Sequence, residues 1–291
     1  MISPFDHGFL FGDGVYEGLR TFSHDGTTRI IGEQRHIARF ARGLRACGVA
    51  WDADQMPALT SELLDANRLT EAFVYWQVTR GTPDLTAGPV RSRVPEHISG
   101  LGAPLPPTVF GYCTAMPALQ LTGGVPALKR ASLEPDLRWH QGSIKSTSLL
   151  GNVLAAICGA AAHGADEVLF VRTVREATGD ERQLLTEGSY TNVVVVLGTG
   201  ANARWVTPDD AKVSILAGVT RDLLLEIEPR LQRADITRAD VLTASEVMLA
   251  GTTTMVTTVS HLDGRGIAAA PGPVAKHLHR VLCEAIQTRR D

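Results

Sequence analysis

An interruption between Thr114 and Gly124 constrains the fold most, because it separates two stretches that each contain strand-like and helix-like patterns. Proline and glycine gather there, in Met116-Pro117 and Thr122-Gly123-Gly124, and such clusters usually form connections. We therefore predict a small N-terminal domain over residues 1–114, a linker over 115–123 and a larger domain over 124–291. The length of 291 residues suits this division, since domains cluster near ~100–150 residues.

The first domain is predicted to combine strands and two helices. A tight turn at Gly12-Asp13-Gly14 precedes a strand rich in β-branched and aromatic residues. We reject a nucleotide-binding loop there, because the spacing is not GxGxxG and the residues that follow alternate like a strand. Apolar residues recur at helical spacing over Gln34–Cys47 and Met56–Asn67. Two further strands are expected over Ala72–Thr79 and Thr108–Cys113.

The second domain is predicted to alternate strands and helices as well. The expected strands are Val125–Ala131, Glu167–Val171 and Val193–Leu197, and the expected helices are Leu149–His163, one from Ile215 to about Glu228 and one from Val274 to about Thr288. A long charged loop is predicted over Thr173–Arg182. We favour a solvated hairpin tip for this loop; the alternative brings Arg175 or Arg182 near a substrate.

Charge and cysteine content exclude several classes of protein. The net charge is −3 and basic residues form no run, which disfavours nucleic acid and membrane surfaces as partners. No apolar run approaches the ~20 residues of a transmembrane helix. The four cysteines are far apart and make no CxxC. We therefore expect reduced, mostly buried thiols in a cytoplasmic protein, with no disulfide framework and no zinc site.

Chemistry that needs a primary amine has few candidates, because the chain has only four lysines, Lys129, Lys145, Lys212 and Lys276. Lys145 alone stands among small hydroxyl residues, directly before an apolar helix. An amine at the end of a strand, largely shielded from water, has a lowered pKa and can act as a nucleophile. The alternative is a lysine that buries its stem and exposes its head.

Two short segments could bind an anion such as phosphate. Gly218-Val219-Thr220 opens a helix, where free N–H groups and the dipole favour negative charge. The loop Gly251-Thr252-Thr253 is a second cradle. Arg39 could clamp phosphate, and Glu187 could meet a cationic ring nitrogen; together with a reactive lysine, these are the groups that pyridoxal 5′-phosphate requires. The ordinary alternatives are a simple helix cap and a surface carboxylate.

Four segments, in this order, resemble class IV aminotransferases, the fold-type IV family of pyridoxal-phosphate enzymes. They are Phe11–Gly18, Arg138-Trp139 with Ile144-Lys145-Ser146, Thr186–Ser189 with Asn192, and Gly218–Arg221. The resemblance spans nearly the whole chain. It implies a two-domain α/β (α+β) fold with a pseudo-barrel sheet in the larger domain. It also implies a homodimer whose active site lies between the domains and is bordered by the partner subunit.

The resemblance assigns roles to individual residues. Lys145 would form the Schiff base and move the proton, and Glu187 would bind the pyridine nitrogen. The remaining cofactor contacts would come from Arg39, Leu216, Gly218, Val219, Thr220, Gly251 and Thr252, and the substrate side would be lined by Tyr16 and Thr253. Relatives usually begin with one or two strands before the Gly-Asp-Gly turn, so we expect either an upstream start or a trimmed first sheet.

The substrate class is predicted from Gln77–Gly81 followed by Arg91-Ser92-Arg93, which is similar to D-amino-acid transaminases. There, an arginine and a second basic residue two positions later hold the substrate carboxylate from the neighbouring subunit. The second position is Arg93 here, where that group carries histidine; guanidinium groups pair bidentately with carboxylate. We expect amino-group exchange between a D-amino acid and a 2-oxo acid such as 2-oxoglutarate or pyruvate. Alternatives are a branched-chain L-aminotransferase, an (R)-selective amine transaminase and an aminodeoxychorismate lyase.

Overall fold

The computed structural model describes residues 2–84, 86, 93–94, 104–267 and 270–288. The chain divides into two compact units: one comprises residues 1–118 with Ile144–Leu149, and the other comprises Leu119–Ser143 with Leu150–Arg290. Both units mix helices and strands, as predicted. The linker over 115–123 stays a prediction, and the segment 144–149, expected within the second domain, packs with the first unit. None of the helices in the described ranges is long and apolar enough to cross a bilayer.

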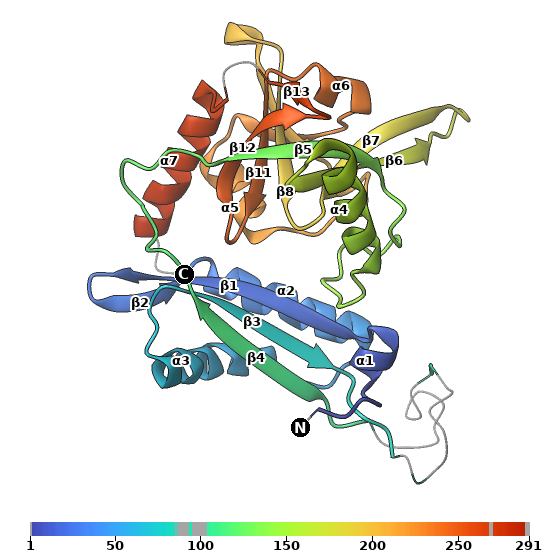
Figure 1. The fold of residues 1–291 in the computed structure, drawn as a ribbon, viewed down its shortest axis with the longest axis vertical. Helices are drawn as coiled ribbons and strands as arrows, with labels where there is room; N and C mark the ends of the chain where they lie inside the picture. The colour runs from blue at the N-terminus through green and yellow to red at the C-terminus, as the bar shows by residue number, and fades with distance from the viewer. Residues whose placement is uncertain (1, 85, 87–92, 95–103, 268–269, 289–291) are drawn as a thin grey trace. The chain divides into compact units, whose positions relative to one another are not determined.

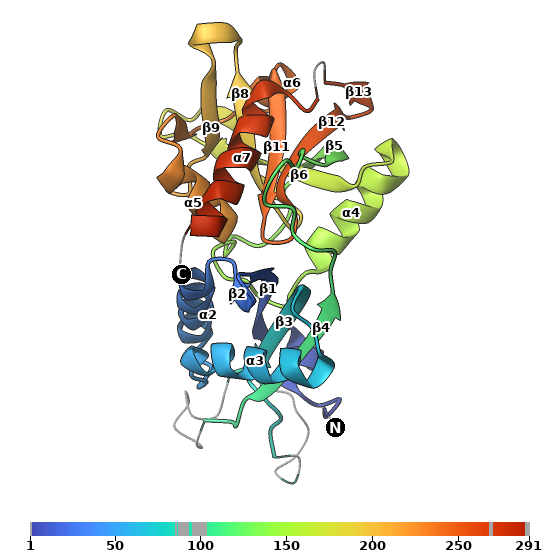
Figure 2. The ribbon, with the colours of Figure 1, turned by 90° about the vertical axis from the view of Figure 1, so that its left-hand side faces the viewer.

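The first unit contains a four-stranded antiparallel sheet in the order β2-β1-β3-β4 (Figure 1). Its elements are α1 (His7–Phe11), β1 (Gly14–His24), β2 (Thr27–Ile30), α2 (Glu33–Cys47), the short 3₁₀ helix Ala53–Gln55, α3 (Met56–Asn67), β3 (Ala72–Thr79) and β4 (Thr108–Ala115). Alternate residues of β1 and β3, such as Leu19 and Val74, share one buried cluster with Phe40 of α2 and Leu64 of α3. Both helices therefore cover the same face of the sheet, which can be followed in Figure 2.

Backbone hydrogen bonds explain why residues 144–149 belong to the first unit. Tyr16 N donates to Lys145 O at 2.9 Å, and Thr147 N donates to Gly14 O at 3.0 Å. Val15 and Ser146 form an isolated antiparallel bridge. The lysine segment therefore lies along the beginning of β1.

The second unit is built on a nine-stranded sheet in the order β10-β9-β8-β11-β12-β5-β6-β7, with β13 paired to β12. The strands are β5 (Leu128–Pro135), β6 (Glu167–Arg175), β7 (Glu181–Gly188), β8 (Asn192–Leu197), β9 (Arg204–Pro208), β10 (Leu231–Ala234), β11 (Glu246–Gly251), β12 (Met255–Leu262) and β13 (Arg265–Gly266). The helices are α4 (Leu150–His163), α5 (Val219–Ile227), α6 (Arg238–Leu242), α7 (Pro273–Thr288) and the short 3₁₀ helix Gly200–Asn202.

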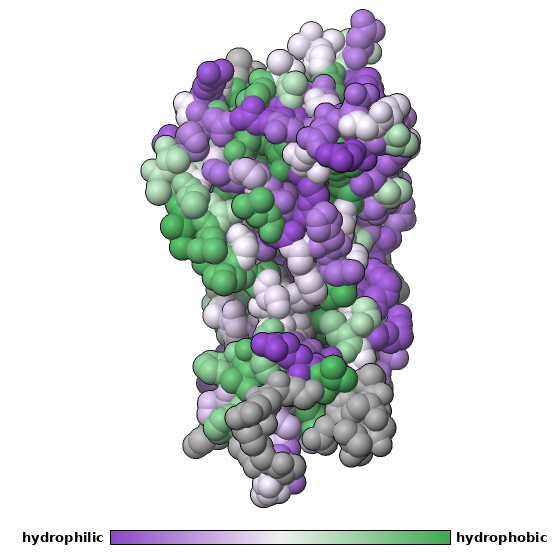
Figure 3. All heavy atoms as spheres, turned by 90° about the vertical axis from the view of Figure 1, so that its right-hand side faces the viewer, coloured by the Kyte–Doolittle hydropathy of each residue, from purple (hydrophilic) through white to green (hydrophobic). Residues whose placement is uncertain are grey.

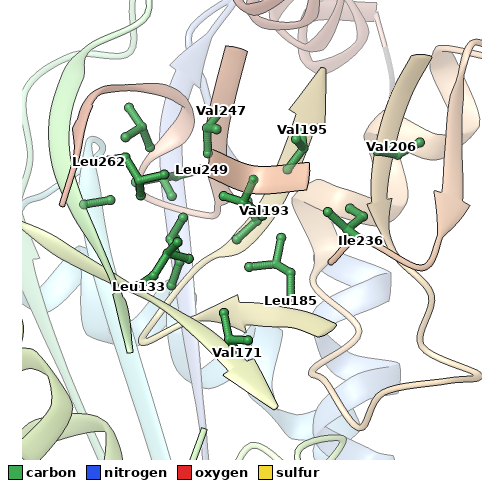
Figure 4. Packing of buried hydrophobic residues seen from close by; sticks show 14 residues of the cluster. Leu133, Val171, Leu185, Val193, Val195, Val206, Ile236, Val247, Leu249 and Leu262 are labelled. Carbon is green, nitrogen blue, oxygen red and sulfur yellow. The ribbon is translucent and has the colours of Figure 1, made fainter. Parts of the chain in front are cut away.

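This larger sheet curls into the barrel-like form that the resemblance predicts. Its two end strands approach each other, because Leu185 N of β7 donates to Ile236 O, just after β10, at 2.7 Å. Aliphatic side chains fill the inside of the curl, and Figure 4 shows those of Leu133, Val193 and Leu249 pointing toward one another. Burial of these apolar surfaces stabilises the curl.

The segment Thr173–Arg182 forms the hairpin tip that we favour, but its loop is shorter than predicted. Strand β6 continues to Arg175 and β7 begins at Glu181, so half of the segment belongs to two paired strands and residues 176–180 form the hairpin tip. Arg175 pairs with Glu181 at 2.9 Å, with both side chains mostly exposed. The outer ends of these strands are mostly charged or polar, so they lack the apolar alternation from which strands are predicted. Helix α1 was also not predicted; Asp6 caps it by accepting a hydrogen bond from Gly8 N.

Candidate active site

Lys145 lies against Tyr16 of β1 in the first unit. Its Nζ atom donates a hydrogen bond to Tyr16 Oη at 3.3 Å and lies 4.4 Å from the centre of the Tyr16 ring. The neighbouring hydroxyl residues anchor this segment: Thr147 Oγ1 donates to Gly12 O at 2.9 Å. Gly12 has a left-handed φ of 66°, and a Cβ atom there would lie 2.5 Å from Ser148 Oγ. The glycine turn and the hydroxyl residues thus fix the position of the amine.

Arg39 lies in a buried ionic cluster of the same unit. Its guanidinium pairs with both carboxylate oxygens of Glu17, and His36 contacts the same carboxylate. Although burial alone would raise the pKa of Glu17, the positive charge of Arg39 and the hydrogen bond from His36 hold it well below its ordinary value. Glu17 and His36 were not predicted as site residues.

Glu187 lies at the centre of a group of hydrogen-bond donors in the second unit. It lies near the end of β7, and its carboxylate accepts hydrogen bonds from Arg138 Nη1 at 2.9 Å, Leu216 N at 2.9 Å and Asn192 Nδ2 at 3.4 Å. Three donors, one of them a guanidinium, favour the ionised carboxylate and fix its orientation. Glu187 is 5% exposed. It is therefore a buried, oriented acceptor rather than the solvated surface carboxylate that the sequence left open.

Arg138 is held in turn by Asp136. Arg138 Nε and Nη2 donate to the two oxygens of Asp136 at 2.9 and 3.0 Å, and Arg172 pairs with the same carboxylate. Burial alone would raise the pKa of Asp136, but hydrogen bonds and charge from Arg138 lower it. The sequence contributed Arg138 only as part of a motif and did not indicate Asp136.

The beginning of α5 is suited to an anion. Gly218 is its N-cap residue, and no described side chain caps this end, so the N–H groups of the first turn point outward without a side-chain partner. A Cβ atom at Gly218 would collide with Asn192 Oδ1. Glycine is therefore required here by the close approach of Asn192, which also contacts Glu187 and Leu216. Val219 and Thr220 follow as the first helical residues.

The turn between β11 and β12 lies beside this region, because β11 pairs with β8 at Ala250 and Asn192. A Cβ atom at Gly251 would lie 2.6 Å from Thr254 Oγ1, so the turn is closely packed around the glycine. Thr252 is half-buried and Thr253 is exposed. The structure thus brings together, within one unit, the predicted residues Glu187, Leu216, Gly218, Val219, Thr220, Gly251 and Thr252.

The predicted carboxylate-binding arginines have no established place in the site. Arg91 lies outside the described residues. Arg93 is exposed, and its guanidinium lies 5.6 Å from the centre of the Phe11 ring. No group of three or more histidine, cysteine, aspartate or glutamate residues arranged to hold a metal ion occurs in the described part of the chain.

Comparison with known proteins assigns the family. The family model described as amino-transferase class IV matches residues 14–262. The D-alanine aminotransferase of Bacillus licheniformis is 29% identical over 288 residues, covering 97% of this chain and 90% of the relative. A putative branched-chain-amino-acid aminotransferase of Methanocaldococcus jannaschii is also 29% identical, over 272 residues, covering 91% of this chain and 84% of the relative.

A solved structure supports the same fold. The branched-chain amino acid aminotransferase from Thermobaculum terrenum, in its pyridoxal-phosphate form, superposes with a TM-score of 0.76 at 20% identity, over 100% of this chain and 90% of that one. The family match covers most of the chain and includes Lys145, Glu187 and both glycine-containing cradles. The chain therefore belongs to the class IV aminotransferases, the fold-type IV family.

Proposed function

We propose that this enzyme exchanges the amino group between a D-amino acid and a 2-oxo acid such as 2-oxoglutarate or pyruvate. Class IV aminotransferases depend on pyridoxal 5′-phosphate, which is therefore its cofactor. The observation that carries the proposal is the Lys145 amine held against Tyr16 by the backbone pairing of its segment with β1. Lys212 and Lys276 are exposed. Lys129 makes a similar contact with Tyr190, but that pair is exposed, whereas the Lys145 pair is partly buried and its backbone is paired with β1.

The residues present fit this cofactor. An amine at Lys145, an oriented carboxylate at Glu187 and an α5 N-terminus without a side-chain cap match the aldehyde, the ring nitrogen and the phosphate, respectively. We assign phosphate contacts to Arg39, Gly218, Val219, Thr220, Gly251 and Thr252, and packing on the ring face to Leu216. When bound, the cofactor supplies an electron sink for the carbon that loses its proton.

The protein side chains then bind, orient and move a proton. Lys145 would hold the cofactor and carry the proton to and from the substrate Cα. Tyr16 Oη, which accepts a hydrogen bond from Lys145 Nζ, would orient this amine and line the substrate side with Thr253. General acid–base catalysis of this kind typically contributes about 10²–10⁴-fold to the rate.

The preference for D-amino acids is supported by the Arg91-Ser92-Arg93 sequence and by the D-alanine aminotransferase relatives. A branched-chain L-aminotransferase is the second candidate, since a putative branched-chain-amino-acid aminotransferase has the same sequence identity to this chain, 29%, as the D-alanine aminotransferase of Bacillus licheniformis. An arginine pair that binds the substrate carboxylate suits neither an (R)-selective amine transaminase nor the branched-chain group. An aminodeoxychorismate lyase would release pyruvate without an amino acceptor.

A half-reaction panel tests this proposal. The purified enzyme, loaded with cofactor, is mixed separately with D-alanine, D-glutamate, L-leucine and (R)-1-phenylethylamine, and the loss of the cofactor's visible absorbance is followed. We expect the D-amino acids to react fastest, and Arg91→Ala to raise KM for amino acids much more than for the amine. A faster reaction with L-leucine than with both D-amino acids would select the branched-chain assignment instead.

We also propose that the enzyme is a homodimer whose partner subunit borders the active site. The outer face of α4 exposes Leu150, Val153, Leu154 and Ile157, each at least half exposed. Figure 3 shows apolar side chains gathered over this helix. Contiguous apolar patches on a soluble protein usually mark an interaction site. A second copy of the chain would cover this face and bring its own Arg91 and Arg93 to the substrate carboxylate.

A further inference from the structure

Glu17, His36 and Arg39 form a buried ionic cluster in the first unit. Glu17 and His36 are 0% exposed and Arg39 is 7% exposed. Burial of a charged group is strongly unfavourable unless it is paired and hydrogen-bonded. Such a cluster often marks a site whose function requires it, although structural ion pairs also occur. Glu17 comes from β1, next to Tyr16, whereas His36 and Arg39 are one turn apart on α2.

The geometry of this cluster holds the guanidinium in one orientation. Arg39 Nε donates to Glu17 Oε2 at 3.0 Å, and Arg39 Nη2 donates to Glu17 Oε1 at 2.6 Å. A bidentate pair fixes both the position and the plane of a guanidinium, which is otherwise carried on a flexible stem. The remaining nitrogen, Nη1, takes no part in this pair with Glu17.

His36 completes the arrangement by holding the carboxylate. His36 Nδ1 lies 3.1 Å from Glu17 Oε1, where a neutral ring donates its N–H. Burial lowers the pKa of His36, and the charges of Arg39 and Lys145 act in the same direction against the effect of Glu17. His36 therefore donates to Glu17 as a neutral ring. His36 Nε2 is buried with no hydrogen-bond partner among the described atoms.

We propose that Glu17, supported by His36, is a positioning residue that presents Arg39 to the phosphate of the cofactor. This inference rests on the proposed function, which assigns Arg39 to that phosphate. The carboxylate acts through the guanidinium and does not itself contact an anion. An arginine already ordered by Glu17 loses less side-chain freedom when the phosphate binds, so its hydrogen bonds contribute more to affinity.

Two forms of the cofactor aldehyde separate positioning from a structural role. Pyridoxal 5′-phosphate and pyridoxal differ only in the phosphate, and both can be titrated into the apoprotein by absorbance and fluorescence. Glu17→Gln keeps the shape of the side chain but removes its charge. We expect its Kd for pyridoxal 5′-phosphate to rise about tenfold or more, as loss of a charged hydrogen bond does. Its Kd for pyridoxal should stay within about twofold of the original value.

The control variants keep this test decisive if Glu17→Gln fails to fold. His36→Asn retains an N–H donor near the position of Nδ1 and should preserve the ratio of the Kd for pyridoxal to the Kd for pyridoxal 5′-phosphate. His36→Leu removes the donor and should reduce this ratio. Equal changes in both dissociation constants, or no change in either, would overturn the positioning role. An unmodified protein that binds both compounds equally would instead contradict the phosphate site and the proposed function itself.

Discussion

At the scale of single residues, we propose that Lys145 carries the chemistry that the family requires. We expect Lys145→Ala to lower kcat/KM by at least about 10²–10⁴-fold, because the proton-transfer group is lost. The protein should also lose the adduct that borohydride fixes, measured by mass spectrometry of the digested protein. Lys212→Ala, which removes an exposed lysine, is the matched control and should retain both properties. A reducible adduct on the Lys145→Ala protein would remove this lysine from the mechanism.

The sequence indicated residues that could take part in the chemistry, but it did not indicate the residues that orient their side chains. Lys145 stood out because lysines are few, and Glu187 because it stands within the Thr186–Ser189 motif. Glu17 lies 22 positions from Arg39, and Arg138 lies 49 positions from Glu187, the side chains that they orient. Such pairings depend on strand register and on helix placement, which periodicity alone does not specify.

At the scale of elements, Glu228 joins the end of α5 to α7. Hydrogen bonds from Arg230, at 2.8 and 2.9 Å, and from His277 of α7 lower the pKa of Glu228 to about 2, from an ordinary value near 4.5. A carboxylate whose pKa is lower in the folded state stabilises the fold above its unfolded pKa, and this stabilisation is lost as the pH falls. Docking of α7 should therefore weaken as the pH falls from about 4.5 to about 2.

This linkage can be measured by thermal unfolding between pH 6 and pH 2. Glu228→Gln should have a lower Tm than the unmodified protein at pH 6, and the difference should shrink as the pH falls through the window set by the two pKa values. Glu284→Gln, on the exposed face of α7, controls for the loss of a carboxylate that does not join the two helices. A constant difference in Tm down to pH 2 would show that Glu228 acts only through packing.

Elements with strong apolar periodicity were predicted well, and those set by local hydrogen bonding were not. The helices α2 and α3 and the strand β3 follow the predicted ranges closely, because their buried faces repeat at regular spacing. Strand β5 begins three residues later than predicted, at Leu128 instead of Val125. Helices α1 and α6 are five residues long and depend on caps at Asp6 and Thr237, so their apolar pattern is too short to recognise.

At the scale of the whole molecule, we propose that the apolar face of α4 joins two subunits that complete each other's active site. Leu154→Glu should convert a homodimer into a monomer, because a buried, unpaired carboxylate opposes association. Light scattering after size-exclusion chromatography would measure the mass, with the protein at a fixed concentration. Leu242→Glu is the matched control, since Leu242 is an exposed leucine on a different helix.

The same variant separates assembly from catalysis. If the partner subunit supplies the arginines that hold the substrate carboxylate, the Leu154→Glu monomer should still bind pyridoxal 5′-phosphate, because the residues assigned to the cofactor lie in one chain. Its KM for D-amino acids should rise much more than its KM for (R)-1-phenylethylamine, because this amine has no carboxylate for the arginines to bind. A fully active monomer would contradict the shared site, and a dimer that persists in Leu154→Glu would place the interface on another surface.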